Sequence, residues 1–163
     1  MEHYFPNLEA TGSNPVGITT FPACSPRNIP EPSTMPNLNS IQLRDMVEAK
    51  YFGNVDNKFL ESVAECFHSD ANFTIQTANL THSGIAEIRR MFTGFFQGYR
   101  KIWHGEFQPV IDVERQTVAV QFVATRDTFD GEHQRANNCN FFHIENGKIK
   151  SVTVYMSDEN PLV

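Results

Sequence analysis

The sequence is 163 residues long and carries a formal net charge of −6, with an isoelectric point near 5.4. This length fits one domain, and the acidic balance argues against a protein that binds nucleic acid through a basic face. No apolar run approaches the roughly 18 residues that span a bilayer, and the first residues lack the basic and apolar regions of a secretory signal. We therefore expect a cytoplasmic protein without nucleic-acid or membrane partners.

The cysteines give no sign of a disulfide framework or a zinc site, because Cys24, Cys66 and Cys139 are odd in number and lack CxxC spacing. Cys139 and His143 share a face of a predicted strand, but four residues of strand separate them by about 13 Å. They cannot both ligate one zinc ion, whose bonds are about 2.0–2.3 Å long. The sequence predicts no metal.

The N-terminal 38 residues differ in amino-acid composition from the rest of the chain. Seven of the nine prolines lie within the first 36 residues, with Gly, Ser, Thr and Asn between them. Such a stretch cannot bury enough apolar area to offset the entropy lost on ordering. We interpret residues 1–38 as a disordered leader and residues 39–163 as the folded domain.

Three helices are predicted at the start of the folded part. The first begins at Ser40, where apolar residues recur every four positions and so share one helical face. A polar interruption at 54–57 separates it from a second helix, which we expect to include Phe67. Ser83 is a candidate N-cap for the third helix. The apolar face of that third helix consists of Ile85, Ile88, Phe92, Phe95 and Tyr99.

Strands dominate the remainder. A short strand is predicted at 71–77, and longer ones at 102–113, 117–129, 133–144 and 148–157. Asp130-Gly131 and Asn146-Gly147 are hairpin turn signals. Because helices do not alternate with these strands, a doubly wound sheet is excluded. The sequence predicts an α+β fold in which a cone-shaped, curved antiparallel sheet wraps around three helices.

Four segments carry a family resemblance: residues 51–71 (YFGNVDNKFLESVAECFHSDA), 83–92 (SGIAEIRRMF), 141–149 (FFHIENGKI) and 155–161 (YMSDENP). They resemble the opening helices, third helix and final hairpin of SnoaL-like domains, in the nuclear-transport-factor-two-like superfamily. The resemblance implies a deep, mostly apolar pocket between helices and sheet, frequent homodimerisation through the sheet, and no metal or organic cofactor. It does not imply one activity, because this fold hosts several enzymes and non-catalytic modules.

Two related enzymes suggest candidate residues. Ketosteroid isomerase uses an Asp base with a Tyr and a protonated Asp; Tyr51 matches its Tyr, but Ile75 or Gln76 stands where the base should be. That route is therefore not expected. Scytalone dehydratase is similar at three positions: His104 matches a catalytic His, Asp56 a pocket Asp and Asn138 a substrate-binding Asn.

These positions form a coherent acid–base set. A neutral histidine can accept and return a proton near neutral pH, a carboxylate can fix its tautomer, and Tyr or Asn can stabilise an enolate oxygen by hydrogen bonding. The candidate catalytic residues are His104, Asp56 and Tyr51. The candidate substrate-binding residues are Asn138, Asn140, Trp103, Val152, Val154 and Met156.

Each candidate also has a purely structural interpretation. His104 and Trp103 are neighbours on a strand, so only one can point inward. Asp56 could cap a helix or a turn, Tyr51 could be ordinary core, and the two Asn residues could serve cross-strand packing.

The sequence therefore supports more than one function. The first is a cofactor-independent cyclase, isomerase or dehydratase acting through an enolate on a hydrophobic oxygenated molecule, such as a polyketide- or terpenoid-like intermediate. The alternative is a non-catalytic small-molecule-binding or dimerisation domain of the same fold.

Overall fold

The computed structural model describes residues 36–157 and 161–162, which belong to one compact unit, Thr34–Val163. Most of the predicted leader lies outside these residues, and its disorder remains a prediction. Leu38, at the leader's predicted end, packs against the core. Its backbone N–H and C=O are both hydrogen-bonded to the side-chain amide of Gln116, at 2.8 and 2.9 Å, so the ordered chain is anchored before the first helix.

The first predicted helix is one continuous run made of α1 (Ser40–Asp45), the π-helix η1 (Met46–Phe52) and α2 (Gly53–Asp56). Asn39 begins it with a reciprocal capping box to Gln42. A π turn bonds residue i to i+5 and so holds more residues than an α turn. This widening turns both Tyr51 and Phe52 inward, and the two residues are 3 % and 2 % exposed. The spacing of an α-helix would place only Tyr51 on the buried face.

The next segment differs from the prediction at both ends. α3 (Leu60–Glu65) ends before Phe67, which begins β1 (Phe67–Ile75) because the backbone there pairs with β6. After the 3-10 helix η2 (Gln76–Ala78), an unpredicted strand β2 (Leu80–Ser83) pairs with β1. Ser83 is therefore a strand residue, and Gly84 is the N-cap of α4 (Ile85–Gly98).

The four long strands are confirmed as β3 (Lys101–Asp112), β4 (Thr117–Asp127), β5 (His133–Glu145) and β6 (Lys148–Met156). Asn146 and Gly147 take positive φ angles of 48° and 74° in the β5–β6 turn, as the Asn-Gly signal predicts. The sheet order is β2-β1-β6-β5-β4-β3. The sheet is mixed rather than wholly antiparallel, since β1 and β6 run parallel.

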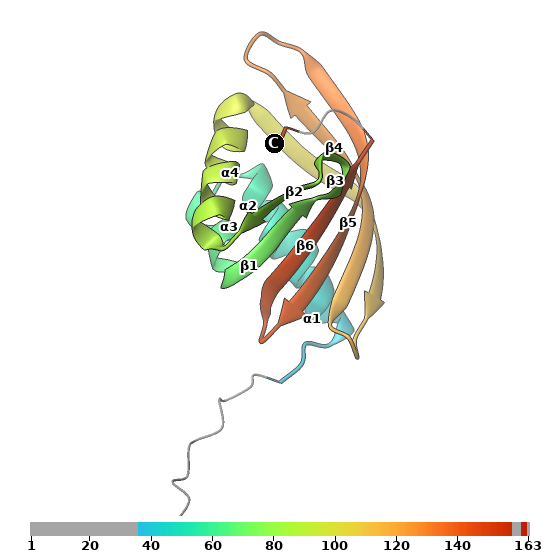
Figure 1. Ribbon diagram of the computed structural model, residues 1–163. Coiled ribbons are helices and arrows are strands. Elements are labelled where there is room, and N and C mark those ends of the chain that lie inside the picture. Colours follow the sequence, from blue (N-terminus) through green and yellow to red (C-terminus); the bar gives the residue numbers. More distant parts are fainter. Residues whose placement is uncertain (1–35, 158–160, 163) are drawn as a thin grey trace, which may run out of the picture. The chain divides into compact units, whose positions relative to one another are not determined.

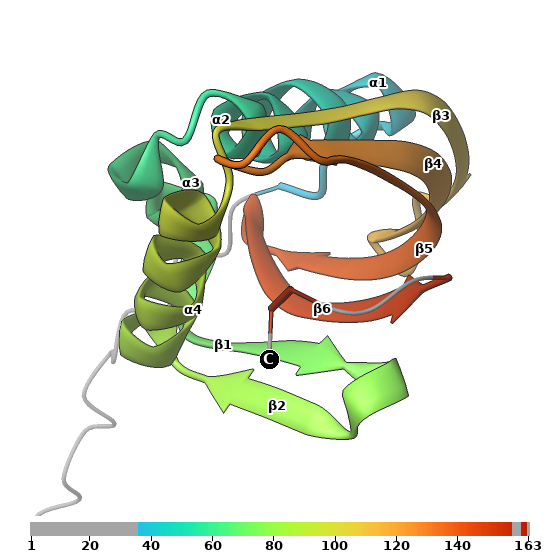
Figure 2. The same ribbon diagram turned by 90° about the horizontal axis from the view of Figure 1, so that it is seen from above.

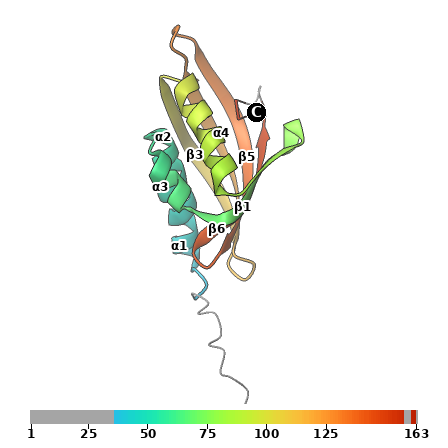
Figure 3. The same cartoon turned by 60° about the vertical axis from the view of Figure 1, so that its left-hand side comes forward.

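The sheet is curved and open, and the helices lie along its concave side (Figure 1). Seen from above, β3 to β6 curl around the interior, while α3 and α4 stand at the open side (Figure 2). α4 packs against β1 and β2, and α2 packs against β3. The turned view shows α4 crossing the concave face (Figure 3).

Aromatic side chains fill the space between these layers. Several ring pairs meet edge to face, including Tyr51 with Phe142 at 5.2 Å between centroids. No helix in the described part of the chain is long and apolar enough to cross a membrane. The α+β cone architecture predicted from the sequence is thus confirmed, and it places the inward faces of η1, β4 and β5 around one interior space.

Candidate functional site

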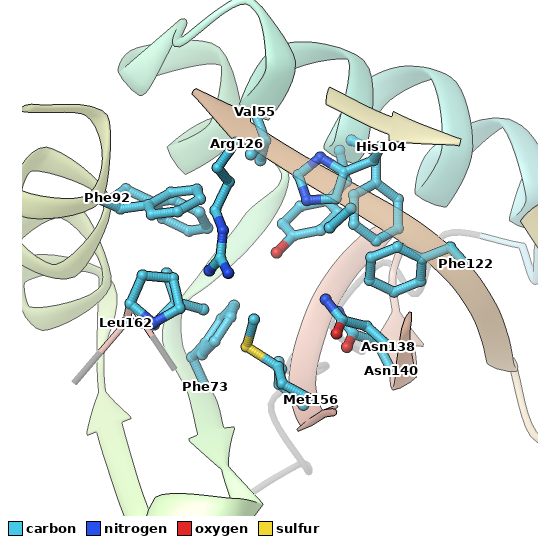
Figure 4. Close-up of a pocket in the computed structure, with 16 residues that line it drawn as sticks. Val55, Phe73, Phe92, His104, Phe122, Arg126, Asn138, Asn140, Met156 and Leu162 are labelled. Carbon is cyan, nitrogen blue, oxygen red and sulfur yellow. The ribbon is translucent and has the colours of Figure 1, made fainter. Parts of the chain in front are cut away.

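A pocket opens between the helices and the concave face of the sheet (Figure 4). The open space between its lining atoms, mouth included, is about 450 Å³, but the centre of a water molecule can occupy only about 30 Å³ of it. This is room for about two waters, so lining side chains must shift to admit a larger molecule. The lining residues are Tyr51, Phe52, Val55, Phe73, Phe92, Phe95, His104, Phe122, Ala124, Arg126, Asn138, Asn140, Val154, Met156, Pro161 and Leu162.

His104 lines this pocket and forms a close pair with Asp56, which is not itself among the lining residues. Nδ1 of His104 lies 2.5 Å from Oδ1 of Asp56, and the His104 backbone N–H donates to Oδ2 at 3.0 Å. Both carboxylate oxygens of Asp56 therefore contact His104, although Asp56 and His104 are 48 positions apart in sequence. Since the ionised carboxylate only accepts, Nδ1 carries the proton, and Nε2 of a neutral ring is left as the acceptor for a ligand.

Aromatic rings fix the histidine further. The imidazole centroid lies 4.8 Å from that of Phe52 and 5.5 Å from that of Phe122. Only 9 % of the His104 side chain is exposed, against 22 % for Asp56. The imidazole is thus held in one orientation in a largely apolar wall, an arrangement that would favour proton transfer without rearrangement of the protein.

Trp103 takes the opposite face of β3. It is 41 % exposed, and its indole folds over Gly105, where an added Cβ would lie 2.2 Å from Trp103 Cζ2. The register between β3 and β4 shifts between Gly105 and Gln108, with Glu106 at a φ of 57°. His104 therefore lies two residues before a β-bulge that begins at Glu106, a feature that re-aims side chains near binding sites. Trp103 is not brought together with the other candidates.

Tyr51 lines the pocket from η1 and lies in the aromatic core. Burial, and to a smaller degree the neighbouring Cys66, raises the pKa of its hydroxyl well above the ordinary value. The phenol is therefore protonated near neutral pH and can act as a hydrogen-bond donor, as an oxyanion partner must.

Asn138 and Asn140 project from the inner face of β5, since alternate residues of a strand share a face. They are 5 % and 3 % exposed, and their side-chain oxygens have no hydrogen-bond partner among the described residues. Buried polar atoms are normally paired, so these two carboxamides suit a polar ligand edge better than packing alone. Val154 and Met156 lie opposite them on β6 and also line the pocket, whereas Val152 is buried beside the pocket and does not line it.

Arg126 is a pocket residue that sequence reasoning missed. It is 3 % exposed, and its guanidinium lies 5.4 Å from the centroid of the Tyr99 ring, a cation–π contact. A signal was available, because the inward alternation of β4 continues by two residues from Ala124 to Arg126. A charged residue at the next inward position of an apolar strand face marks a candidate site.

No group of three His, Cys, Asp or Glu side chains in residues 36–157 and 161–162 is arranged to hold a metal ion. The described pocket residues can supply proton transfer through His104, and hydrogen bonding through Tyr51, Asn138, Asn140 and Arg126.

Comparison with known proteins agrees with this architecture. Residues 49–152 match the family model of the SnoaL-like domain, and no curated protein sequence matches the chain. A proposed polyketide cyclase from Xanthomonas campestris pv. campestris has a similar structure, with 14 % identity, a TM-score of 0.65, and coverage of 71 % of this chain and 90 % of that one.

Two further solved structures are similar. A proposed isomerase from Bacillus subtilis has 14 % identity and a TM-score of 0.65, covering 74 % of this chain and 90 % of that chain. PrhC from Penicillium brasilianum has 13 % identity and a TM-score of 0.63, covering 72 % of this chain and 81 % of that chain. At these identities the likeness establishes the fold alone.

Proposed function

The chain belongs to the SnoaL-like domain family, and from that premise we propose that it is a cofactor-independent acid–base enzyme. Its substrate is a hydrophobic, oxygenated small molecule such as a polyketide- or terpenoid-like intermediate. The reaction passes through an enolate, which leads to ring closure, isomerisation or dehydration. The observation that carries the proposal is His104, which lines an apolar pocket and is held at 2.5 Å by Asp56.

Proton abstraction is assigned to Nε2 of His104. It takes a proton from the carbon next to a substrate carbonyl, and the C–H electrons form a carbon–carbon double bond as the carbonyl oxygen becomes an enolate. Asp56 keeps the proton on Nδ1 and stabilises the imidazolium that forms. Asp56 is a positioning residue in this scheme, because it acts through His104.

Stabilisation of the enolate oxygen is assigned to Tyr51 and the carboxamide N–H groups of Asn138 and Asn140, which act as donors in a water-poor pocket. The later step decides the reaction type. In each case the imidazolium of His104 gives its proton back: to another carbon in an isomerisation, to the alkoxide formed when the enolate carbon attacks a second carbonyl in a ring closure, or to a neighbouring hydroxyl that leaves as water in a dehydration. Val154 and Met156 contribute apolar contact.

The alternative is a non-catalytic pocket that binds an apolar ligand. The narrow interior favours it, since the water-accessible volume of about 30 Å³ is small for a substrate. The pair of His104 and Asp56 argues for the enzyme, because a simple binding pocket has no need of an oriented base.

Homodimerisation through the sheet is part of the proposal. The outer face carries exposed apolar side chains on neighbouring strands, with Phe141 50 % and Tyr155 43 % exposed and their rings 5.9 Å apart. Exposed aromatic pairs of this kind mark association surfaces. Sedimentation of the protein should show a dimer that Phe141→Glu dissociates; a monomeric wild-type protein would contradict this part.

The enolisation step can be tested without the natural substrate. Exchange of the α-hydrogens of bicyclic ketones such as 2-tetralone with D₂O, followed by NMR, reports proton abstraction directly. The wild-type protein should accelerate exchange, and His104→Gln should lower the enzymatic rate by about 10²–10⁴-fold.

The control is His133→Gln, which removes an exposed histidine that also pairs with an aspartate. It should leave the exchange rate unchanged. Equal rates for His104→Gln and the wild-type protein would eliminate His104 as the base, and no acceleration by the wild-type protein for any ketone of the set would favour the binding-pocket alternative.

A further inference from the structure

Lys58 lies in the turn between α2 and α3, two residues after Asp56. Its Nζ donates to the backbone carbonyl of Phe96 at 3.1 Å and also to that of Tyr99. Both carbonyls lie at the C-terminal end of α4, 38 and 41 positions further along the chain. The Lys58 side chain therefore bridges two segments that are far apart in sequence.

The bridge suits the chemistry of both partners. The last carbonyls of an α-helix have no partner within the helix and carry partial negative charge. The last turn of α4 contains no basic residue of its own. A lysine ammonium has three N–H donors and no acceptor, so Lys58 satisfies two carbonyls at this helix end from a neighbouring turn.

The backbone of Lys58 is a second observation that points to a role for its side chain. Its φ is 56°, in the left-handed region where glycine and asparagine are common and other residues are unusual. Glycine would adopt this turn with less strain. The hydrogen bonds of the ammonium offset the strain, and a local outlier held in this way is a reason to look for a function.

The two bridged segments carry the two members of the buried His–Asp pair. Asp56 ends α2 just before the turn, and β3, which contains His104, begins two residues after Tyr99. Asp56 contacts both the imidazole Nδ1, at 2.5 Å, and the backbone N–H of His104, at 3.0 Å. A shift of the turn relative to β3 would therefore disturb both contacts at once.

Hydrogen bonds within the turn do not prevent such a shift. The Lys58 N–H donates to the Val55 carbonyl at 3.0 Å, and the Phe59 N–H donates to the Asn54 carbonyl at 3.0 Å. These bonds fix the shape of the turn but not its place beside β3. The bonds from the Lys58 ammonium cross from the turn to the end of α4, directly before β3.

We propose that Lys58 is a positioning residue, whose ammonium fixes the α2–α3 turn against the end of α4 and so holds the Asp56 carboxylate on His104. The catalytic meaning of this assignment rests on the proposed function. The tautomer of the imidazole can be measured in the resting protein, without substrate or turnover.

Lys58→Gly tests the bridge without adding backbone strain, because glycine adopts a positive φ readily. Nitrogen-15 NMR of the neutral histidine rings distinguishes the Nδ1–H tautomer from the Nε2–H tautomer, and His104→Gln identifies the His104 signals. The wild-type protein should hold His104 in the Nδ1–H form, since Asp56 accepts that proton. In Lys58→Gly the ring should become a mixture that includes the Nε2–H form.

Two control variants separate this effect from a general loss of stability. Asn39→Ala removes the N-cap at the far end of the first helical run, which destabilises the helix without touching the pair. Lys50→Met removes an exposed lysine that pairs with Asp45. Both should keep the wild-type tautomer of His104. Circular dichroism checks that every variant is folded, and Lys58→Asn, which also tolerates a positive φ, replaces Lys58→Gly if the latter does not fold.

Ketone exchange gives the second readout. Lys58→Gly should lower kcat for exchange by about tenfold or more, because displacement of a catalytic group by about 1 Å can cost about 10²-fold. KM should change little, since Lys58 does not line the pocket.

A folded Lys58→Gly or Lys58→Asn protein that keeps the wild-type tautomer would overturn the proposal, as would a His104 ring that is already a mixture in the wild-type protein. Neither result depends on catalysis. If the wild-type protein exchanges no ketone but Lys58→Gly changes the tautomer, the positioning role stands and the proposed enzymatic function fails, so the two ideas fail separately.

Discussion

Two His–Asp pairs within residues 36–157 have nearly the same contact geometry. His104 Nδ1 lies 2.5 Å from Asp56 Oδ1, and His133 Nδ1 lies 2.6 Å from Asp127 Oδ1. The aspartates are equally exposed, at 22 % each, but the histidine side chains differ, at 9 % for His104 and 63 % for His133.

The surroundings of the two pairs differ as much as their exposure. His104 packs against Phe52 and Phe122 in the pocket wall. His133 begins β5 beside an exposed hairpin and shares the Asp127 carboxylate with Arg100, which contacts its other oxygen. A short His–Asp contact is therefore not in itself a site. Burial, fixed ring orientation and an adjoining cavity make the His104 pair suited to catalysis.

The largest expected difference between the pairs is in activity. Asp56→Asn should lower ketone exchange by about 10²-fold or more, because the wrong tautomer of the histidine is then allowed, while Asp127→Asn should change it less than about twofold. NMR of the exchange reaction measures both variants. Similar losses of exchange activity in the two variants would mean that the contact between Asp56 and His104 affects activity only through the stability of the fold.

Removal of packing around each pair should separate them in stability. Phe52→Ala deletes a ring that is 2 % exposed and should lower the free energy of unfolding by about 3–5 kcal/mol. Phe129, 70 % exposed beside the other pair, should tolerate the same change within about 0.5 kcal/mol. Urea denaturation checks both, with Phe52→Leu as the milder variant; equal losses would contradict the burial argument.

The bulge after His104 gives a smaller effect. Gly105→Ala places a Cβ against the Trp103 indole. The indole must move to avoid this overlap, which should lower the free energy of unfolding by about 1–3 kcal/mol. Trp103 is the single tryptophan of the chain, so its fluorescence should shift to the red as the ring moves into water. Gly53→Ala, where a Cβ meets nothing within 4 Å, is the control. An unchanged spectrum for Gly105→Ala would show that the indole does not cover Gly105.

The smallest effect concerns pH. The hydrogen bond from His133 is the main cause that lowers the pKa of Asp127 below its ordinary value. Its stabilising contribution is present above the unfolded pKa of about 3.9 and is lost as the pH falls through the lowered folded pKa. The midpoint temperature of thermal unfolding should therefore fall slightly less between pH 5 and pH 2 for Asp127→Asn than for the wild-type protein. A steeper acid loss in the variant would reverse the assignment.

Much of the fold could be predicted because its signals are local. Apolar spacing marks the helices, alternation marks the long strands, and Asn146-Gly147 selects its own turn. The errors lie where pairing with distant residues decides: Phe67 suits a helix by spacing but joins β6, and Leu80–Ser83 has too few residues for a strand signal.

Individual residues of the candidate site could be predicted from the sequence, but their arrangement could not. His104, Asp56, Tyr51 and Asn138 could be named from a family resemblance, but adjacent positions left the choice between His104 and Trp103 open. The β3 ladder and its bulge point His104 inward, and no local pattern encodes that choice. Arg126 was missed because charged strand residues usually face water.

By itself, the sequence determined the α+β class and the order of most elements. These follow from residue type and from periodicity over a few neighbours. Only the tertiary structure decided that His104, and not His133, lines the pocket, and that Arg126 shares it. Such facts depend on contacts between residues far apart in the chain, such as the 48 positions between Asp56 and His104, where packing rather than local propensity sets the distance.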